Sequence, residues 1–167
     1  MNAECHGPPA TLLVRWADPA AEQHIAVLLH DAVADPGEVA GLLWRRWVTV
    51  LGDLTLPPSA PPLAAAAFRI DRQARTAHLI AIGVLKPWRR KGLGRRLLTG
   101  TMTLLRAEGV DRVNAWAHPG TAGSSFLVSA GFVTCDYTAH AGGPSRFQLL
   151  LLALVTPGNV SLARQCR

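Results

Sequence analysis

The sequence predicts a mixed α/β protein built around one central sheet. Two observations lead to this fold class: strand-like and helix-like segments alternate along the chain, and two adjacent apolar runs have the pattern of a β-hairpin. The 167 residues are 49% hydrophobic and 17% charged, which is typical of a globular chain long enough to bury its own core. We therefore expect a single domain over residues 1–167, with loose termini at 1–10 and 156–167.

The N-terminal part is expected to contribute one strand and two helices. Residues 11–17 ("TLLVRWA") form a strand-like run, and apolar residues recur at helical spacing over 20–34. The Asp-Pro-Gly sequence at 35–37 would end that helix, and a second helix is predicted over 38–51. The proline-rich loop at 56–62 does not suit a normal strand, so we expect the sheet to lack a strand there or to have a distorted edge.

The middle of the chain predicts a hairpin followed by an amphipathic helix. Residues 63–70 and 76–84 are separated by "DRQAR", a turn that is longer than the minimal one. A helix is expected over 92–107, and Gly109 is a suitable residue to end it. The apolar face of this helix would consist of Leu93, Leu97, Leu98, Met102 and Leu105.

The C-terminal part predicts three more strands and a short helix. The segment 112–118 is strand-like, 123–130 has the pattern of a short helix, and 132–137 and 146–155 are strand-like again. The apolar run from Leu149 is too short to cross a bilayer and suits a buried strand, so no membrane association is expected.

Cysteine usage and the N-terminus favour a cytoplasmic protein. Cys5, Cys135 and Cys166 are odd in number and widely spaced, which is neither a disulfide framework nor a metal-binding pattern. Cys135 is expected to be a buried strand residue. No signal peptide opens the chain. We therefore expect a reducing compartment and no metal.

Five of the 17 basic residues lie in one eight-residue window, whereas other arginines are scattered singly or in pairs. The formal net charge is +6 and the pI about 10.2, which by itself would suggest a nucleic-acid partner. A local cluster suits a compact polyanion better than a long phosphate backbone, so a nucleic-acid partner is not expected and rests on charge alone. The cluster consists of Arg89, Arg90, Lys91, Arg95 and Arg96.

This cluster surrounds a glycine-rich turn between a strand and a helix. Such a turn directs several backbone N–H groups to one point, and the helix N-terminus adds roughly half a positive charge. Glycine lets a ligand approach the main chain closely. The predicted ligand is a pyrophosphate. The sequence does not match the dinucleotide-binding motif Gly-x-Gly-x-x-Gly, because Leu97 stands at the position of its third glycine. It does not match the P-loop motif either, because Gly94 is followed by Arg95 and not by the lysine that the P-loop requires.

The pattern that does match is Arg-x-x-Gly-x-Gly, at residues 89–94. It resembles the acetyl-CoA loop of the GNAT N-acetyltransferase superfamily. The preceding strand "HLIAIGV" and the later "SAGFV" also resemble that family, as does the order of elements from 63 to 154. The resemblance implies a mixed, mostly antiparallel sheet of about six or seven strands flanked by about four helices.

The resemblance also assigns the cofactor residues, with acetyl-CoA as co-substrate. In the family, backbone groups of the fourth strand pair with the pantetheine arm, and the loop holds the pyrophosphate. Here this implies Ile82, Gly83 and Val84 for the arm. Arg89 would anchor the loop, and the phosphates would be held by Arg90, Lys91, Gly92, Leu93, Gly94 and Arg95.

The resemblance offers His78 as the catalytic base. It lies six residues before Val84, where one branch of the family places glutamate and another histidine. Imidazole titrates near neutral pH, so it suits removal of a proton from an amine; the alternative is a histidine hydrogen-bonded in or near the core. His118 is the second candidate base, with plain surface as its alternative.

The general acid is less clearly assigned. Leu127 stands where family members often carry a tyrosine, and Gly120 and Gly123 replace the usual asparagine and alanine. Tyr137 is the only tyrosine of the chain and is the candidate acid, with packing as the alternative. Water is a further proton source. Ser124 and Ser125 would hydrogen-bond CoA or cap the short helix.

The predicted function is transfer of an acetyl group from acetyl-CoA to an amine, directly in a ternary complex. The acceptor is a small molecule or a peptide, and the protein is a monomer or homodimer. The alternative is a non-catalytic acyl-CoA-binding or partner-binding domain. The acceptor surface is expected from residues 22–47, the proline-rich loop and 137–146. The carboxylates that would attract a cationic acceptor are Asp31, Asp35, Glu38 and Asp53, with ordinary solvated carboxylates as the alternative. Trp44 and Trp47 would line a pocket for a flat or hydrophobic acceptor, with core packing as the alternative.

Overall fold

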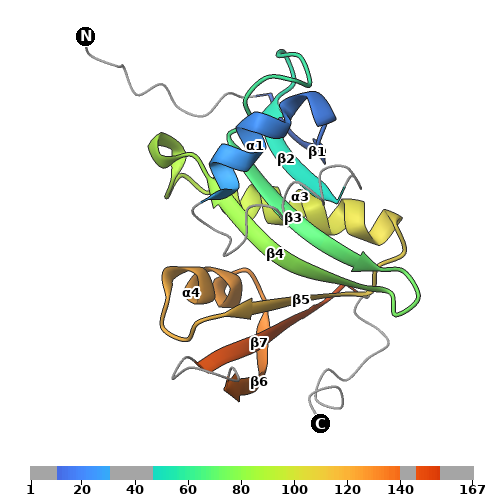
Figure 1. The fold of residues 1–167 in the computed structure, drawn as a ribbon, viewed down its shortest axis with the longest axis vertical. Helices are drawn as coiled ribbons and strands as arrows, with labels where there is room; N and C mark the ends of the chain where they lie inside the picture. The colour runs from blue at the N-terminus through green and yellow to red at the C-terminus, as the bar shows by residue number, and fades with distance from the viewer. Residues whose placement is uncertain (1–10, 31–46, 140–145, 155–167) are drawn as a thin grey trace. The chain divides into compact units, whose positions relative to one another are not determined.

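The computed structural model describes residues 11–30, 47–139 and 146–154 (Figure 1). Their hydrogen-bonded strands follow the order β1-β2-β3-β4-β5-β7-β6. The chain divides into two compact units. The first comprises Met1–Ala67 and Ala81–Thr101, and the second comprises Phe68–Ile80 and Met102–Arg167. The predicted mixed, mostly antiparallel α/β fold is confirmed.

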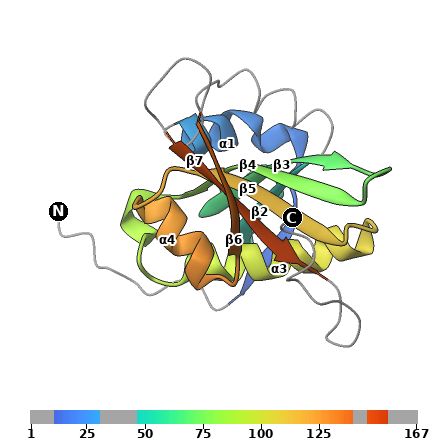
Figure 2. The same ribbon diagram turned by 90° about the horizontal axis from the view of Figure 1, so that it is seen from below.

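Strands β1 (Leu12–Trp16), β2 (Val48–Asp53) and β3 (Ala64–Asp71) are antiparallel neighbours. The first unit contains β1, β2 and the first half of β3, up to Ala67. The four alanines at 64–67 are completely buried, although alternate side chains of a strand point to opposite faces. Both faces of β3 are therefore covered. Figure 2 shows α1 (Glu22–Leu29) on one side of these strands and α3 (Leu93–Ala107) on the other.

Helix α1 packs on the sheet through Ile25, Leu28 and Leu29, which are all buried. It lies very close to the end of β4 (Thr76–Val84). A Cβ added to Gly83 would lie 2.6 Å from Leu28 Cδ2 and 2.9 Å from the Leu28 carbonyl oxygen. Glycine at 83 is therefore what allows the helix to approach the strand so closely.

Helix α3 buries the apolar face that the sequence predicts, from Leu93 to Leu105. On the same helix, the Thr101 hydroxyl forms a buried hydrogen bond of 2.7 Å with the Thr49 hydroxyl of β2. The helix ends in a Schellman turn: the Gly109 and Val110 N–H groups donate to the carbonyls of Arg106 and Leu105. Gly109 has a φ of 82°, as this turn requires.

The second unit is built on β5 (Arg112–Ala117), β6 (Val133–Ala139) and β7 (Arg146–Ala153). Strand β7 lies between β5 and β6 and is antiparallel to both. The first residues of β4 pair with β5 in parallel. Helix α4 (Ala122–Ser129) is capped by Thr121, whose side chain accepts a hydrogen bond from the Ser124 N–H. The cap is therefore neither Ser124 nor Ser125.

The helix predicted over 38–51 is wrong at its C-terminal end. Residues 48–51 belong to β2, which pairs with β1 on one side and β3 on the other. The expectation of a missing strand was also wrong, because β2 supplies that strand just before the proline-rich loop. Residues 48–51 are buried and three of them, Val48, Thr49 and Val50, are β-branched. Pairing on both sides of this strand outweighs the helical spacing of its apolar residues. Residues 31–46, including the start of the predicted helix and Trp44, lie outside the described residues.

Candidate functional site

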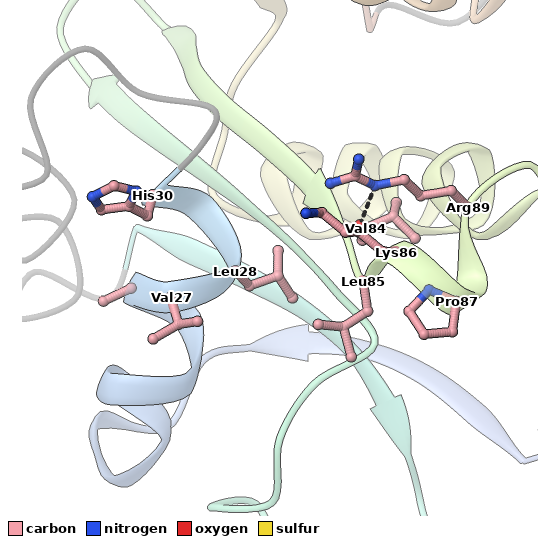
Figure 3. A pocket seen from close by; sticks show the side chains of 9 residues that line it. Val27, Leu28, His30, Val84, Leu85, Lys86, Pro87 and Arg89 are labelled. Carbon is pink, nitrogen blue, oxygen red and sulfur yellow. Dashed lines mark hydrogen bonds between the residues drawn. The ribbon is translucent and has the colours of Figure 1, made fainter. Parts of the chain in front are cut away.

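The turn between β4 and α3 is held by hydrogen bonds to its own backbone. The Leu85 N–H donates to the Leu63 carbonyl at 3.0 Å, and a short 3-10 turn follows at Lys86–Trp88. The Arg89 side chain folds back, and its Nε donates to the Val84 carbonyl at 2.9 Å (Figure 3). This bond ties the turn to the end of β4, which is what an anchoring role for Arg89 requires.

The backbone of the turn has the geometry of an anion site. Arg90 and Gly92 both have left-handed φ angles, 62° and 78°. The Gly92 carbonyl accepts the first hydrogen bond of α3, from the Arg96 N–H at 3.0 Å. The cap residue thus has no side chain that could accept a hydrogen bond from the Gly94 N–H, and the first turn, which begins at Leu93, contains no acidic residue. The N–H groups of this first turn and the helix dipole favour a negatively charged ligand.

Exposed cations flank these N–H groups. Arg89, Arg90, Lys91 and Arg95 are all exposed, and the Lys91 ammonium lies 4.7 Å from the centre of the Trp88 ring. Arg96 differs, because its terminal nitrogen donates to the Leu12 carbonyl at 2.6 Å and so binds β1. The structure thus brings the loop residues predicted from the sequence together around the start of α3.

A pocket of about 570 Å³ lies beside this turn (Figure 3). The end of α1 forms one wall, and the end of β4 with the following turn forms the other. Most of the lining is apolar, and Val27 is 78% exposed. The polar residues of the lining are His30, Lys86 and Arg89; none of the lining residues is acidic. The pocket suits an apolar group attached to an anionic or neutral one.

The end of β4 provides backbone groups next to this pocket. Its parallel pairing with β5 covers Thr76–Leu79 and ends there, whereas β4 itself continues to Val84. The edge of β4 at Ile82–Val84 therefore has no hydrogen-bonded strand on the β5 side within the described chain. A Cβ added to Gly83 would point toward α1, so this glycine has a packing role that the sequence did not reveal.

His78 is half-buried in the first part of β4, within the second unit. Its partner in the parallel register is Asn114 of β5. The Asn114 Oδ1 atom is buried and has no hydrogen-bond partner among the described residues. Sequence reasoning missed Asn114, because nothing except the sheet register places it beside His78.

The other proposed catalytic positions lie in different elements. Tyr137 belongs to β6, opposite Gln148 of β7. Leu127, where the family often has tyrosine, is a buried residue of α4 that is only 5% exposed. His118 is an exposed residue after β5 whose carbonyl accepts hydrogen bonds from Thr121.

The described residues contain no group of His, Cys, Asp or Glu placed to hold a metal ion. Cys135 is half-buried rather than buried.

Asp53 has a structural role. Its carboxylate accepts hydrogen bonds from the Thr55 N–H and from the hydroxyls of Thr11 and Thr55. The backbone bond from Thr55, followed by these hydroxyl bonds, lowers the pKa of Asp53 below its ordinary value. Trp47 packs edge-on against Trp16, with ring centres 6.3 Å apart. The carboxylates at 31, 35 and 38 lie outside the described residues.

Comparison with known proteins identifies the family. Residues 13–132 match the acetyltransferase (GNAT) family, so the chain belongs to that family. A comparison with curated protein sequences finds no match.

Solved structures share the fold. The ribosomal-protein-S18-alanine N-acetyltransferase of Escherichia coli is similar with a TM-score of 0.69 and 18% identity, covering 90% of this chain and 99% of that one. The yncA protein of Salmonella typhimurium, solved with acetyl-CoA, is similar with a TM-score of 0.66 and 18% identity, covering 92% of this chain and 99% of that one. A Bacillus subtilis acetyltransferase in complex with CoA is similar with a TM-score of 0.69 and 15% identity, covering 86% of this chain and 99% of that one. Family membership supports acetyl transfer from a CoA-type co-substrate in general.

No described helix combines the length and the apolar character needed to cross a membrane.

Proposed function

We propose that this protein is an N-acetyltransferase that moves the acetyl group of acetyl-CoA to an amine, directly in a ternary complex. The observation that carries the proposal is the turn before α3. There, Arg90 and Gly92 have left-handed φ angles, the helix starts directly after a glycine, and its first turn has no acidic residue. Family membership supports the same co-substrate. We also propose that residues 1–167 act as one domain and need no metal.

Acetyl-CoA fits the groups that the first unit offers. The pyrophosphate would be held by the N–H groups of Gly92, Leu93 and Gly94, with charge neutralised by Arg90, Lys91 and Arg95. The pantetheine arm would hydrogen-bond to the edge of β4 at Ile82–Val84, which has no strand partner on the β5 side. Arg89 would keep both parts in register through its bond to Val84.

The chemistry needs a base, a polarised carbonyl and a proton for the leaving thiolate. We assign the base to His78, whose imidazole would take a proton from the acceptor ammonium. The amine nitrogen then attacks the thioester carbon, and an N–H near Gly83 and Val84 stabilises the developing oxyanion. The C–S bond breaks, the amide forms, and the CoA thiolate takes a proton from Tyr137 or from water.

We propose that the acceptor approaches over α1. The pocket between α1 and the end of β4 joins residues predicted for the acceptor to residues predicted for the cofactor. Its apolar walls would hold an apolar group of the acceptor, from a small molecule or a peptide, while the ammonium would lie outside the pocket because none of the described lining residues is acidic. The names of two similar structures mention a protein or peptide: one is the ribosomal-protein-S18-alanine N-acetyltransferase, and the other is a NatC complex bound to a Gag peptide and CoA.

A second candidate function is non-catalytic binding of an acyl-CoA. The observation that favours it is Leu127, a buried apolar residue where the family often has its acid. The two functions are separated by measuring CoA release from acetyl-CoA with a panel of amines and peptides, using wild type and His78→Gln. We expect turnover that falls by about 10²–10⁴-fold in His78→Gln. Binding of acetyl-CoA without turnover of any amine would favour the second function.

A further inference from the structure

The pocket beside the turn has two walls of different chemistry, and both belong to the first unit. The wall from α1 consists of residues 26–28 and is apolar, with Val27 78% exposed. The wall from the turn consists of residues 84–87 and Arg89, and it is apolar except for Lys86 and Arg89. The His30 ring points away from the turn (Figure 3). Within the described lining, Lys86 and Arg89 are therefore the cations placed to meet a bound molecule.

The short 3-10 turn places these two cations on the same side. The Arg89 N–H donates to the Lys86 carbonyl at 3.3 Å, and a bond of this kind brings residues three apart to one side of a 3-10 turn. The Arg89 side chain is fixed further by its Nε bond to the Val84 carbonyl. Both charged ends extend from the turn toward the α1 side of the pocket (Figure 3). Two neighbouring like charges repel each other, so an anion bound by both is favoured.

The anion that suits this place is a carboxylate on an apolar molecule. None of the described lining residues is acidic, so this lining favours a negative group over a positive one. An ammonium and a planar guanidinium together supply donors for both oxygens of a carboxylate. The apolar wall of α1 gains from covering an apolar group. The pyrophosphate of acetyl-CoA is proposed to bind elsewhere, at the N–H groups that begin α3.

We propose that the acceptor is a small amine that carries a carboxylate next to an apolar group, with an apolar α-amino acid such as leucine as the model. The inference rests on the proposed function and narrows its acceptor. The carboxylate binds Lys86 and Arg89, the apolar side chain lies against residues 26–28, and the amine lies outside the lining, toward the end of β4. A peptide fits less well, because its N-terminal residue has no free carboxylate.

The reaction is the one already proposed. The amine nitrogen bonds to the acetyl carbon while the C–S bond breaks. Of the two protons that the ammonium loses, one leaves with CoA as its thiol and the other passes to solvent. The product is an N-acetyl amino acid that keeps the carboxylate.

Binding of the carboxylate can be measured without turnover. Full-length protein saturated with CoA is titrated calorimetrically with 4-methylpentanoate, which is leucine without its amine, and with the uncharged 4-methylpentanamide. Wild type is expected to bind the carboxylate about tenfold more tightly, and Lys86→Met to lose most of that preference. Lys91→Met is the matched contrast. Lys91 lies over the Trp88 ring and is not among the described lining residues, so its loss should keep the preference.

Lys86→Glu is the second variant, and Lys86 is exposed, so neither replacement disturbs the core. Its carboxylate is expected to reverse the preference, so that the amide binds more tightly than 4-methylpentanoate. The Kd for CoA, measured separately, is expected to stay within about threefold of wild type in Lys86→Met. Equal affinity of wild type for carboxylate and amide overturns the inference. A Lys86→Met variant that loses as much affinity for CoA as for the carboxylate also overturns it, because Lys86 would then serve the cofactor.

Kinetics separate this inference from the proposed function. Acetylation of L-leucine, L-leucinamide and L-alanine is followed by the release of CoA. The kcat/KM for leucine is expected to exceed that for leucinamide, which lacks the carboxylate, and for alanine, which has a smaller side chain, by about tenfold each. Leucinamide acetylated as efficiently as leucine would uphold the proposed function and overturn the inference. Carboxylate binding that depends on Lys86, without acetylation of any amine, would support the carboxylate site and refute the proposed function.

Discussion

Replacing Gly92 by alanine is expected to weaken acetyl-CoA binding while leaving the fold largely intact. Gly92 has a φ of 78°, and an added Cβ would meet no heavy atom within 4 Å. The penalty is therefore backbone strain alone, about 1–2 kcal/mol for an L-residue in the left-handed region. Because the turn is exposed around Gly92, the free protein can relax and avoid that strain. Acetyl-CoA must then restore the strained turn, so its Kd is expected to rise by about 5–30-fold.

Gly109→Ala is the matched control, at the other end of the same helix. Its φ is 82°, and an added Cβ there also meets no heavy atom within 4 Å. Gly109 N–H is part of the Schellman turn, so the strain is expected to appear as lost stability, with a fall in Tm of about 2–8 °C. Calorimetric unfolding gives Tm, and titration calorimetry with acetyl-CoA gives Kd. The reasoning is refuted if Gly92→Ala binds as tightly as wild type, or if both variants lose affinity equally.

Four further substitutions test the packing of the fold and the anchoring of the turn. Gly83→Ala is expected to destabilise the fold by about 1–3 kcal/mol in chemical denaturation, since its Cβ would lie 2.6 Å from the Leu28 side chain; unchanged stability would contradict the close α1–β4 packing. Arg89→Met is expected to raise the Kd for acetyl-CoA about fivefold with little change in Tm, as about 1 kcal/mol of anchoring is lost; equal affinity would argue against the anchor. Thr49→Val and Thr101→Val are each expected to lose about 1–3 kcal/mol, whereas the double variant is close to wild type. Additive losses would show that the two hydroxyls do not depend on each other.

Local patterns were sufficient for most of the fold. The bounds of β4 were predicted to the residue, and the start of α3 to within one, because alternation, an amphipathic face and a terminal glycine act over a few neighbouring residues. Strand β2 was missed because its stability comes from pairing with β1 and β3, which lie far from it in the sequence. A window of local sequence contains no information about those partners.

The candidate site divides in the same way. The turn at residues 89–94 could be found from the sequence, since its glycines and cations are contiguous. The packing role of Gly83 depends on where α1 lies, and the pairing of His78 with Asn114 depends on the β4–β5 register. Both are long-range properties. They emerge only when the strands and helices are placed in space.

The most direct test of the central claim, that the turn before α3 binds the pyrophosphate of acetyl-CoA, is thermal unfolding with and without acetyl-CoA. Wild type is compared with the Gly92→Asp/Gly94→Asp variant, which places two carboxylates among the phosphate-binding N–H groups. At about a hundred times Kd the ligand is expected to add about 2.7 kcal/mol to wild type, a rise of several degrees in Tm, and to leave the variant unchanged. A folded wild-type protein whose Tm does not respond to acetyl-CoA, or a variant that responds equally, would contradict the claim.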